Sequence, residues 1–184
     1  MFSDMYIETE RLILRPLCPD DTDQLQAVVG QDEVVRYLPE DVMSRDEVAE
    51  IIDWLQDCYR TNSPERIIKF TVAVVLKETG KIIGWCGLGP LDFRPDEVEK
   101  FYGLDQACWN RGLATEAGGA MSKYAFETIG LEKIVAVVNP DNIASLRSIA
   151  KLGFTFDEIV TDIPAEHDFY SGFHHYVLSR DNYN

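Results

Sequence analysis

The chain has 184 residues, of which 46% are hydrophobic and 27% are charged. These values are typical of one soluble globular domain, and they exclude a disordered or fibrous chain. A formal net charge of −15 argues against a nucleic-acid partner, because duplex binding relies on basic side chains that neutralise phosphates. The longest apolar stretches, such as residues 72–76, are far too short to span a bilayer, so no membrane partner is expected.

The amino-terminal run MFSDMYIETERL lacks both the basic and the apolar region of a signal peptide. Four cysteines stand singly at positions 18, 58, 86 and 108, without the paired spacing of a zinc site, so no metal is expected. Isolated cysteines fit a reducing cytoplasm, and each is interpreted as a small buried apolar residue in preference to a catalytic thiol.

Charge is distributed unevenly along the chain. Residues 109–154 contain five basic and four acidic residues and carry +1, so the remainder carries −16. A locally neutral segment in an acidic chain favours an anionic ligand there and a cationic substrate elsewhere. An equally simple interpretation is that acidic surfaces keep the protein in solution.

The amino-terminal part predicts one strand and two helices. Residues 11–15, RLILR, alternate charged and apolar side chains and predict the first strand. Asp20 and Asp21 are candidate caps of the first helix. Ser44 and Glu47 form a capping-box pattern, and apolar residues at helical spacing follow it, which predicts a long amphipathic helix.

A meander of strands follows in the middle of the chain. Residues 68–76 and 81–88 predict two antiparallel strands joined by the turn KETG. Residues 88–97 contain two prolines and a glycine and predict a loop. Residues 98–104 predict the next strand.

The carboxy-terminal part predicts a crossover and two further strands. Residues 133–138 form a short, nearly all-apolar strand of the kind that is buried in a sheet. Asn142 and Gly153 are candidate caps at the two ends of a helix. Alternating patterns predict strands over residues 154–160 and 173–179. This order of elements predicts an α+β domain with one βαβ crossover in its second half.

The stretch WNRGLAT, residues 109–115, joins the strand over 98–104 to a helix predicted over 114–128, with Gly130 as its C-cap. Small residues at Gly112 and Ala114 would let backbone N–H groups approach a phosphate, at the positive end of the helix dipole. A turn of this composition is also ordinary punctuation between a strand and a helix.

Residues 99–117, EKFYGLDQACWNRGLATEA, and the later DNIASLRSIAKLGF resemble the acetyl-CoA-binding core of the GCN5-related N-acetyltransferase (GNAT) superfamily. The opening TERLILRPL and the W-x-x-G-x-A-T-E-A loop are similar to the branch that includes ribosomal-protein N-terminal acetyltransferases. The resemblance covers nearly the whole chain and implies one domain over residues 1–184. It implies a three-layer α+β fold, with a mixed, mostly antiparallel sheet of six or seven strands, helices on both faces and a splayed strand pair at the cofactor site.

The resemblance also implies acetyl-CoA as co-substrate, with pantetheine pairing like a substitute strand. The amides of residues 110–115 would hold the pyrophosphate, and Arg111 would add charge. Arg147 and Lys151 share one helix face and are assigned to the 3′-phosphate or adenine, although solvent-facing charges are an equal alternative. The cofactor residues implied in this way are Tyr102, Gly103, Leu104, Asn110, Arg111, Gly112, Leu113, Ala114, Thr115, Asn142, Ser145, Arg147 and Lys151.

Acetyl transfer to an amine needs a base, an oxyanion donor and a group that protonates or stabilises sulfur. A backbone N–H near Leu104 is the candidate donor. Many relatives place a tyrosine in the last helix for the sulfur, but the matching residue here is Ile149. The ribosomal branch uses a serine, which matches Ser145, and the alternative for Ser145 is a helix-start serine bonded to backbone.

Two carboxylates are candidates for the base. Glu99 lies on the strand that splays, and Glu166 lies in the polar loop where ribosomal-type relatives carry a comparable carboxylate. Either could instead be a solvated surface charge. Histidines offer a third source of a base, but His174 and His175 alternate along a strand and so point to opposite faces.

The resemblance therefore implies an acetyl-CoA-dependent N-acetyltransferase that acts on a primary amine, such as a protein N-terminus, a polyamine or a small amine. The acidic composition favours a cationic acceptor. The alternative is a non-catalytic acyl-CoA-binding module of the same fold, which Ile149 favours. Exposed strands at the carboxy-terminal edge allow either a monomer or a homodimer.

Overall fold

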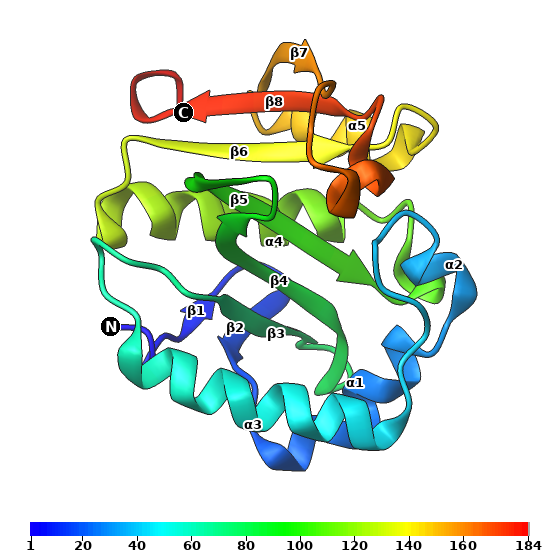
Figure 1. Ribbon diagram of the computed structural model, residues 1–184. Helices are drawn as coiled ribbons and strands as arrows, with labels where there is room; N and C mark the ends of the chain where they lie inside the picture. The colour runs from blue at the N-terminus through cyan, green and yellow to red at the C-terminus, as the bar shows by residue number, and fades with distance from the viewer. Residues whose placement is uncertain (184) are drawn as a thin grey trace.

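The computed structural model describes residues 1–183, in which eight strands form one sheet (Figure 1). The strands are β1 (Ile7–Glu8), β2 (Leu12–Pro16), β3 (Phe70–Leu76), β4 (Lys81–Leu91), β5 (Arg94–Leu104), β6 (Lys133–Val138), β7 (Thr155–Ile159) and β8 (His174–Ser179). Their spatial order is β1-β2-β3-β4-β5-β6-β8-β7, and only β5 and β6 are parallel neighbours. The predicted mixed, mostly antiparallel sheet is confirmed. It has eight strands because the two-residue β1, which the sequence does not reveal, pairs with β2.

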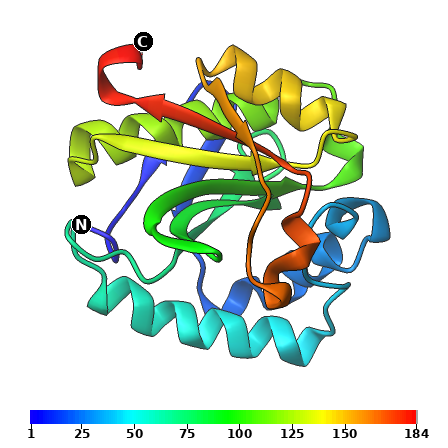
Figure 2. The same cartoon turned by 45° about the horizontal axis from the view of Figure 1, so that its top comes forward.

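Helices cover both faces of the sheet. They are α1 (Thr22–Val29), α2 (Asp32–Val35), α3 (Arg45–Thr61), α4 (Leu113–Lys123) and α5 (Ile143–Lys151). In Figure 2, α4 and α5 lie together on one side of the sheet and α3 lies on the other. Within residues 1–183, no helix has both the length and the hydropathy needed to cross a membrane.

The long helix α3 forms as its sequence predicts. The Ser44 hydroxyl accepts a hydrogen bond from the Glu47 N–H (3.3 Å), and the Glu47 carboxylate accepts one from the Ser44 N–H (2.8 Å). Val48, Ile52 and Leu55 recur on one face of α3 and are almost fully buried against the sheet. The capping box therefore fixes the start of α3, and the apolar stripe fixes which face it buries.

The loop predicted over residues 88–97 is wrong. The strand β4 continues to Leu91 and β5 already begins at Arg94, with Pro90 opposite Val98 and a bulge between Pro90 and Leu91. On its other side β4 pairs with β3 only as far as Leu88. Beyond that point the edge of β4 is free, so a proline there removes no ladder hydrogen bond.

Two helix ends differ in part from the ends that the sequence predicts. Asp21 is the N-cap residue of α1, as predicted, but its side chain makes no capping hydrogen bond. Its carboxylate instead accepts a bidentate pair of hydrogen bonds from Arg15 (2.6 and 2.8 Å) and one from the Cys18 N–H. The helix predicted over 114–128 is α-helical only to Lys123 and continues as a π-helical turn, Tyr124–Ile129. Gly130 ends this turn with φ +91°, which confirms it as the C-cap.

Lys100 is an unusual component of the interior. It lies on β5 with 3% of its surface exposed, and its Nζ has no hydrogen-bond partner within residues 1–183. The Nζ atom lies 5.4 and 5.2 Å from the ring centroids of Tyr102 and Phe154. Burial lowers the pKa of Lys100 from 10.5 to about 8.

Replacing Lys100 with methionine is expected to raise the free energy of unfolding by about 1–3 kcal/mol at neutral pH, because it removes an uncompensated buried charge. The pKa of Lys100 is lower in the folded state than in the unfolded chain, so the unfolded chain binds more protons between these two values. The wild type therefore becomes relatively more stable as the pH rises from 8 towards 10.5, and the gain from Lys100→Met should shrink. Urea denaturation of both proteins at neutral and alkaline pH measures this, and a less stable variant at neutral pH would contradict it.

Candidate functional site

A cavity of about 670 Å³ opens where β5 and β6 separate. The two parallel strands share a single registered pair, Glu99 opposite Val135, and then diverge (Figure 1). Residues 99–102 of β5 and 136–138 of β6 line the cavity, so it follows the opening between the strands. The predicted splayed strand pair is thereby confirmed. Ile51 and Trp54 of α3 line another part of the cavity wall.

Glu99 is a half-buried carboxylate in the wall of this cavity. Burial raises the pKa of Glu99 to about 7, an effect that Lys69 opposes and Asp92 and Glu40 reinforce. Asp92 and Glu40 also line the cavity. A carboxylate that titrates near neutral pH is suited to accept a proton from a bound substrate.

Ser145 and Tyr102 bring two hydroxyl groups together in the same cavity. The Asn142 side chain accepts a hydrogen bond from the Ser145 N–H (3.1 Å), which confirms Asn142 as the N-cap of α5. The Ser145 hydroxyl oxygen accepts a hydrogen bond from the Tyr102 hydroxyl (3.2 Å). Ile149, one turn further along α5, is 1% exposed and presents only an apolar side chain.

Main-chain groups at the end of β5 point towards the opening. The Asp105 N–H donates to the Ile83 carbonyl of β4 (2.8 Å). Because ladder hydrogen bonds alternate along an antiparallel pair, Gly103 is expected to bond towards β4, and Tyr102 and Leu104 towards the side where β6 departs. The main-chain groups that this edge can offer a ligand are therefore those of Tyr102 and the N–H of Leu104.

Gly103 and Trp109 have structural contacts of their own. A Cβ atom on Gly103 would lie 2.3 Å from the ring of Trp85, so this glycine leaves room for an indole that lines the cavity. The Trp109 indole N–H donates to the Leu104 carbonyl (2.7 Å). Trp109 therefore fixes the start of the WNRGLAT loop against the end of β5, and the Leu104 carbonyl already has a partner.

The WNRGLAT loop has the backbone geometry of an anion site. Asn110 and Gly112 both have left-handed backbone conformations, with φ of 59° and 77°, on either side of Arg111. Gly112 is the N-cap of α4, and the amides of the first helical turn follow it. Alternation of backbone hand in a turn directs consecutive N–H groups into one concavity, and the dipole of α4 favours an anion there.

Arg11 and Glu116 hold this loop in place. The Glu116 carboxylate accepts hydrogen bonds from the Thr9 hydroxyl (2.6 Å) and from the N–H and guanidinium of Arg11. Arg11 also donates to the Arg111 carbonyl (2.8 Å). Burial opposes ionisation of Glu116, but these donors outweigh it and hold the pKa of Glu116 below its usual value. The sequence signals for this clamp are the TER and ATEA runs, and neither residue was among the predicted site residues.

The structure thus brings together part of the predicted set. Glu99, Tyr102, Asn142 and Ser145 line one cavity. Arg147 and Lys151 are exposed on α5, and Glu166 is exposed on the 3-10 turn Ala165–Tyr170; these three do not line the cavity. Arg111 is exposed, with its guanidinium 3.9 Å from Glu78, and the Thr115 hydroxyl lies 3.2 Å from that of Ser148.

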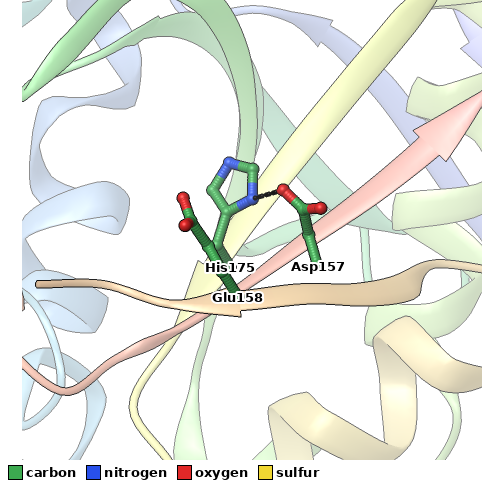
Figure 3. Close-up of side chains that lie close together, drawn as sticks. All are labelled: Asp157, Glu158 and His175. Carbon is green, nitrogen blue, oxygen red and sulfur yellow. Dashed lines mark hydrogen bonds and ion pairs between the residues drawn. The ribbon is translucent and has the colours of Figure 1, made fainter.

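A second cluster of titratable groups lies outside the cavity, on β7 and β8 (Figure 3). Ligand atoms of Asp157, Glu158 and His175 lie within 4.8 Å of one another. The buried His175 ring is 3.1 Å from Asp157 through Nδ1 and 3.0 Å from Glu97 through Nε2, and Glu158 pairs with Arg94. Because each group already has a partner, the cluster is a cross-strand network that ties β5 to β7 and β8. His174, as predicted, lies on the opposite face from His175.

Several acidic residues line a second pocket that adjoins the cavity. A shallower pocket of about 540 Å³ shares Glu40, Met43, Ile51 and Trp54 with the cavity. Its carboxylates, here called the acidic mouth, are Glu40, Asp41, Glu47 and Glu50. The site therefore combines an apolar wall with several carboxylates on the side of the sheet that α3 covers.

Comparisons with known proteins agree with this architecture. A family model described as "Acetyltransferase (GNAT) domain" matches residues 11–155. The uncharacterized N-acetyltransferase YoaA of Bacillus subtilis (strain 168) is 31% identical over 148 residues, which cover 80% of this chain and 81% of that protein.

Two solved structures illustrate the shared fold. The ribosomal-protein-S5-alanine acetyltransferase of Vibrio fischeri matches with a TM-score of 0.78 and 18% identity, covering 98% of this chain and 100% of that one. The spermidine N-acetyltransferase of Vibrio cholerae, solved in complex with CoA and spermine, matches with a TM-score of 0.75 and 17% identity, covering 95% and 99% of the two chains.

Proposed function

Because the chain belongs to the GNAT family of acetyltransferases, we propose that it transfers the acetyl group of acetyl-CoA to a primary amine. The observation that carries this proposal is the cavity between β5 and β6. There a carboxylate with a pKa of about 7, Glu99, and a hydroxyl pair, Ser145 and Tyr102, line the same space. The four cysteines are free, which supports a reducing compartment such as the cytoplasm for this reaction.

The residues around the opening fit acetyl-CoA. Main-chain groups of Tyr102 on the open edge of β5 would pair with the pantetheine amides, as a further strand would, and the Leu104 N–H stays free for the thioester carbonyl. The left-handed turn at Asn110 and Gly112 and the first amides of α4 would bind the pyrophosphate. Arg147 and Lys151 lie on exposed turns of α5, which packs beside α4, and in this proposal they reach the 3′-phosphate or adenine.

Each chemical requirement then has a candidate group. Glu99 accepts a proton from the substrate ammonium, which frees the nitrogen lone pair for attack on the thioester carbonyl. The Leu104 N–H donates to the carbonyl oxygen as negative charge grows on it. Ser145 donates a proton to the departing sulfur. The acetyl group itself comes from the thioester of acetyl-CoA.

The surroundings of Glu99 favour a cationic, partly aliphatic acceptor. Glu40 and Asp92 line the cavity together with Glu99, and the acidic mouth adjoins the cavity at Trp54 and Ile51. Carboxylates attract ammonium groups, while the apolar wall can contact an alkyl chain. The same fold occurs in the spermidine N-acetyltransferase of Vibrio cholerae, and a diamine or polyamine fits this chemistry better than a neutral amine.

Neutralising two carboxylates of the acidic mouth in the double variant Glu40→Gln/Glu50→Gln is expected to raise KM for a diamine about 5-fold, because exposed ion pairs contribute about 0.2–1 kcal/mol each. KM for a monoamine of the same chain length should change less, since it lacks the second charge. Steady-state kinetics with both amines measures the difference, and Glu10→Gln, an exposed carboxylate outside both pockets, is the matched control. Equal changes for both amines would argue against recognition of a second cation.

A panel of amines incubated with acetyl-CoA and followed by release of free thiol tests the proposed function. Thiol release should depend on the amine and should be fastest with diamines and polyamines. The competing function is a non-catalytic acyl-CoA-binding module, favoured by Ile149, which leaves α5 without the tyrosine of many relatives. Binding of CoA without amine-dependent thiol release across the panel would favour that module.

A further inference from the structure

Tyr102 lines the cavity from β5. Its hydroxyl donates a 3.2 Å hydrogen bond to the Ser145 hydroxyl oxygen, although the two residues lie 43 positions apart. We propose that Tyr102 and Ser145 form a two-hydroxyl relay to the sulfur of the departing CoA, in which Tyr102 acts through Ser145. This inference rests on the proposed acetyl transfer. In this relay the tyrosine hydroxyl beside α5 comes from β5, because α5 itself has Ile149 at the position where many relatives have a tyrosine.

The contacts of Ser145 leave its hydroxyl free for this role. The Ser145 N–H at the start of α5 is bonded to the Asn142 side chain, so the cap of the helix is supplied by Asn142. The Ser145 hydroxyl oxygen accepts from Tyr102, and in that geometry its own proton can point into the cavity. A serine that served only to hydrogen-bond backbone groups at the helix start would have no use for a hydrogen bond from the Tyr102 hydroxyl.

Acidity explains why a second hydroxyl helps. The phenol of tyrosine has a reference pKa of about 10, far below that of an aliphatic alcohol, and a thiol has one of about 8.5. Serine alone would become a high-energy alkoxide if it gave its proton to sulfur. With Tyr102 behind it, Ser145 receives a proton as it donates one, so the negative charge ends on the phenol oxygen.

The protein interior next to the Tyr102 ring can stabilise a negative charge on the phenol oxygen. The ammonium of Lys100 lies 5.4 Å from the centroid of the Tyr102 ring and has no hydrogen-bond partner in the described part of the chain. A positive charge at this depth is weakly screened and stabilises negative charge nearby. The lysine costs stability where it lies, which is the pattern expected of a group retained for function.

Atoms and charges balance in this scheme. The amine nitrogen bonds to the carbonyl carbon, the carbon–sulfur bond breaks, and sulfur leaves with the electron pair. Sulfur takes the Ser145 hydroxyl proton, Ser145 takes the Tyr102 proton, and Tyr102 recovers one from solvent. Glu99 accepts the first ammonium proton before attack and then releases it to solvent. The second proton leaves nitrogen for solvent as the amide forms, and it balances the proton that Tyr102 recovers.

Tyr102→Phe removes the outer hydroxyl while keeping the ring. We expect kcat to fall about 10- to 30-fold, a modest share of the effect of general acid catalysis, with KM for acetyl-CoA and the affinity for CoA changed less than about 2-fold. Tyr176→Phe is the matched control, because Tyr176 is a strand tyrosine whose hydroxyl lies 3.5 Å from His174 and which does not line the cavity. An unchanged kcat in Tyr102→Phe, or a change confined to KM, would overturn the relay.

A double-mutant cycle adds a readout that a purely structural role would not move. Since Tyr102 acts through Ser145, the double variant Tyr102→Phe/Ser145→Ala should be no slower than Ser145→Ala alone. Losses that multiply would overturn the relay. Wild-type protein that binds CoA but acetylates no amine would overturn the proposed function itself, whereas an active wild type with an unaffected Tyr102→Phe would overturn only the relay.

Discussion

Gly112→Glu is expected to weaken acetyl-CoA binding at least about 100-fold, because it removes or opposes charge-assisted hydrogen bonds worth about 1.5–3 kcal/mol each. Gly112 is the left-handed N-cap of α4, directly before the amides proposed to bind the pyrophosphate. A glutamate there fills the concavity and places a carboxylate where phosphate oxygens would lie. Calorimetric titration with acetyl-CoA measures the loss.

The fold should survive this substitution. A Cβ atom on Gly112 would meet only the Arg11 guanidinium, at 3.6 Å, so the main cost is the left-handed backbone at φ +77°, about 1–2 kcal/mol. Gly80→Glu is the matched control, because Gly80 has φ +67° and nothing within 4 Å of its Cβ position, in the turn between β3 and β4. Gly80→Glu should lose similar stability but keep its affinity. Unchanged affinity in Gly112→Glu would mean that phosphate binds elsewhere.

Glu99→Gln is expected to lower kcat about 10²- to 10³-fold, the range for loss of a general base, while acetyl-CoA binds as before. The base must be deprotonated to work and its pKa is raised to about 7, so wild-type kcat/KM should rise with pH through about 7 and then level off. Glutamine does not titrate, and this inflection should disappear in the variant. Initial rates across the pH range measure both effects.

Glu166→Gln provides the comparison. Glu166 is exposed on the turn Ala165–Tyr170, apart from the residues that line the cavity, and its replacement should change kcat less than about 2-fold. If Glu166→Gln lost activity and Glu99→Gln kept it, the base would lie in the carboxy-terminal loop. A pH profile that Glu99→Gln leaves unaltered would also exclude Glu99.

Local signals in the sequence were sufficient for several elements of the fold. The Ser44–Glu47 capping box and the Gly130 C-cap depend on hydrogen bonds and backbone angles within a few residues, so the chain itself specifies them. The strand residues within 88–97 were not predicted, because a proline such as Pro90 indicates a loop unless its side of the strand has no partner strand. Whether that edge is free depends on where β3 ends, which is not local information.

Some residues of the site could likewise be predicted from local motifs, whereas the contacts between distant positions could not. Glu99, Ser145 and the WNRGLAT loop follow from motifs, and the structure places Glu99 and Ser145 in one cavity. The hydrogen bond from Tyr102 to Ser145 joins positions 43 apart, and the one from Arg11 to Glu116 joins positions 105 apart. These contacts depend on how α4 and α5 pack on the separating strands, which sequence spacing alone does not determine.

The most direct test of acetyl transfer by this protein is mass-spectrometric identification of the products after incubation of wild-type protein with acetyl-CoA and a primary diamine. We expect an N-acetylated diamine and free CoA in equal amounts, formed many times per enzyme molecule. Bound CoA without any acetylated amine, or CoA released by hydrolysis to acetate at the same rate with and without the diamine, would contradict it.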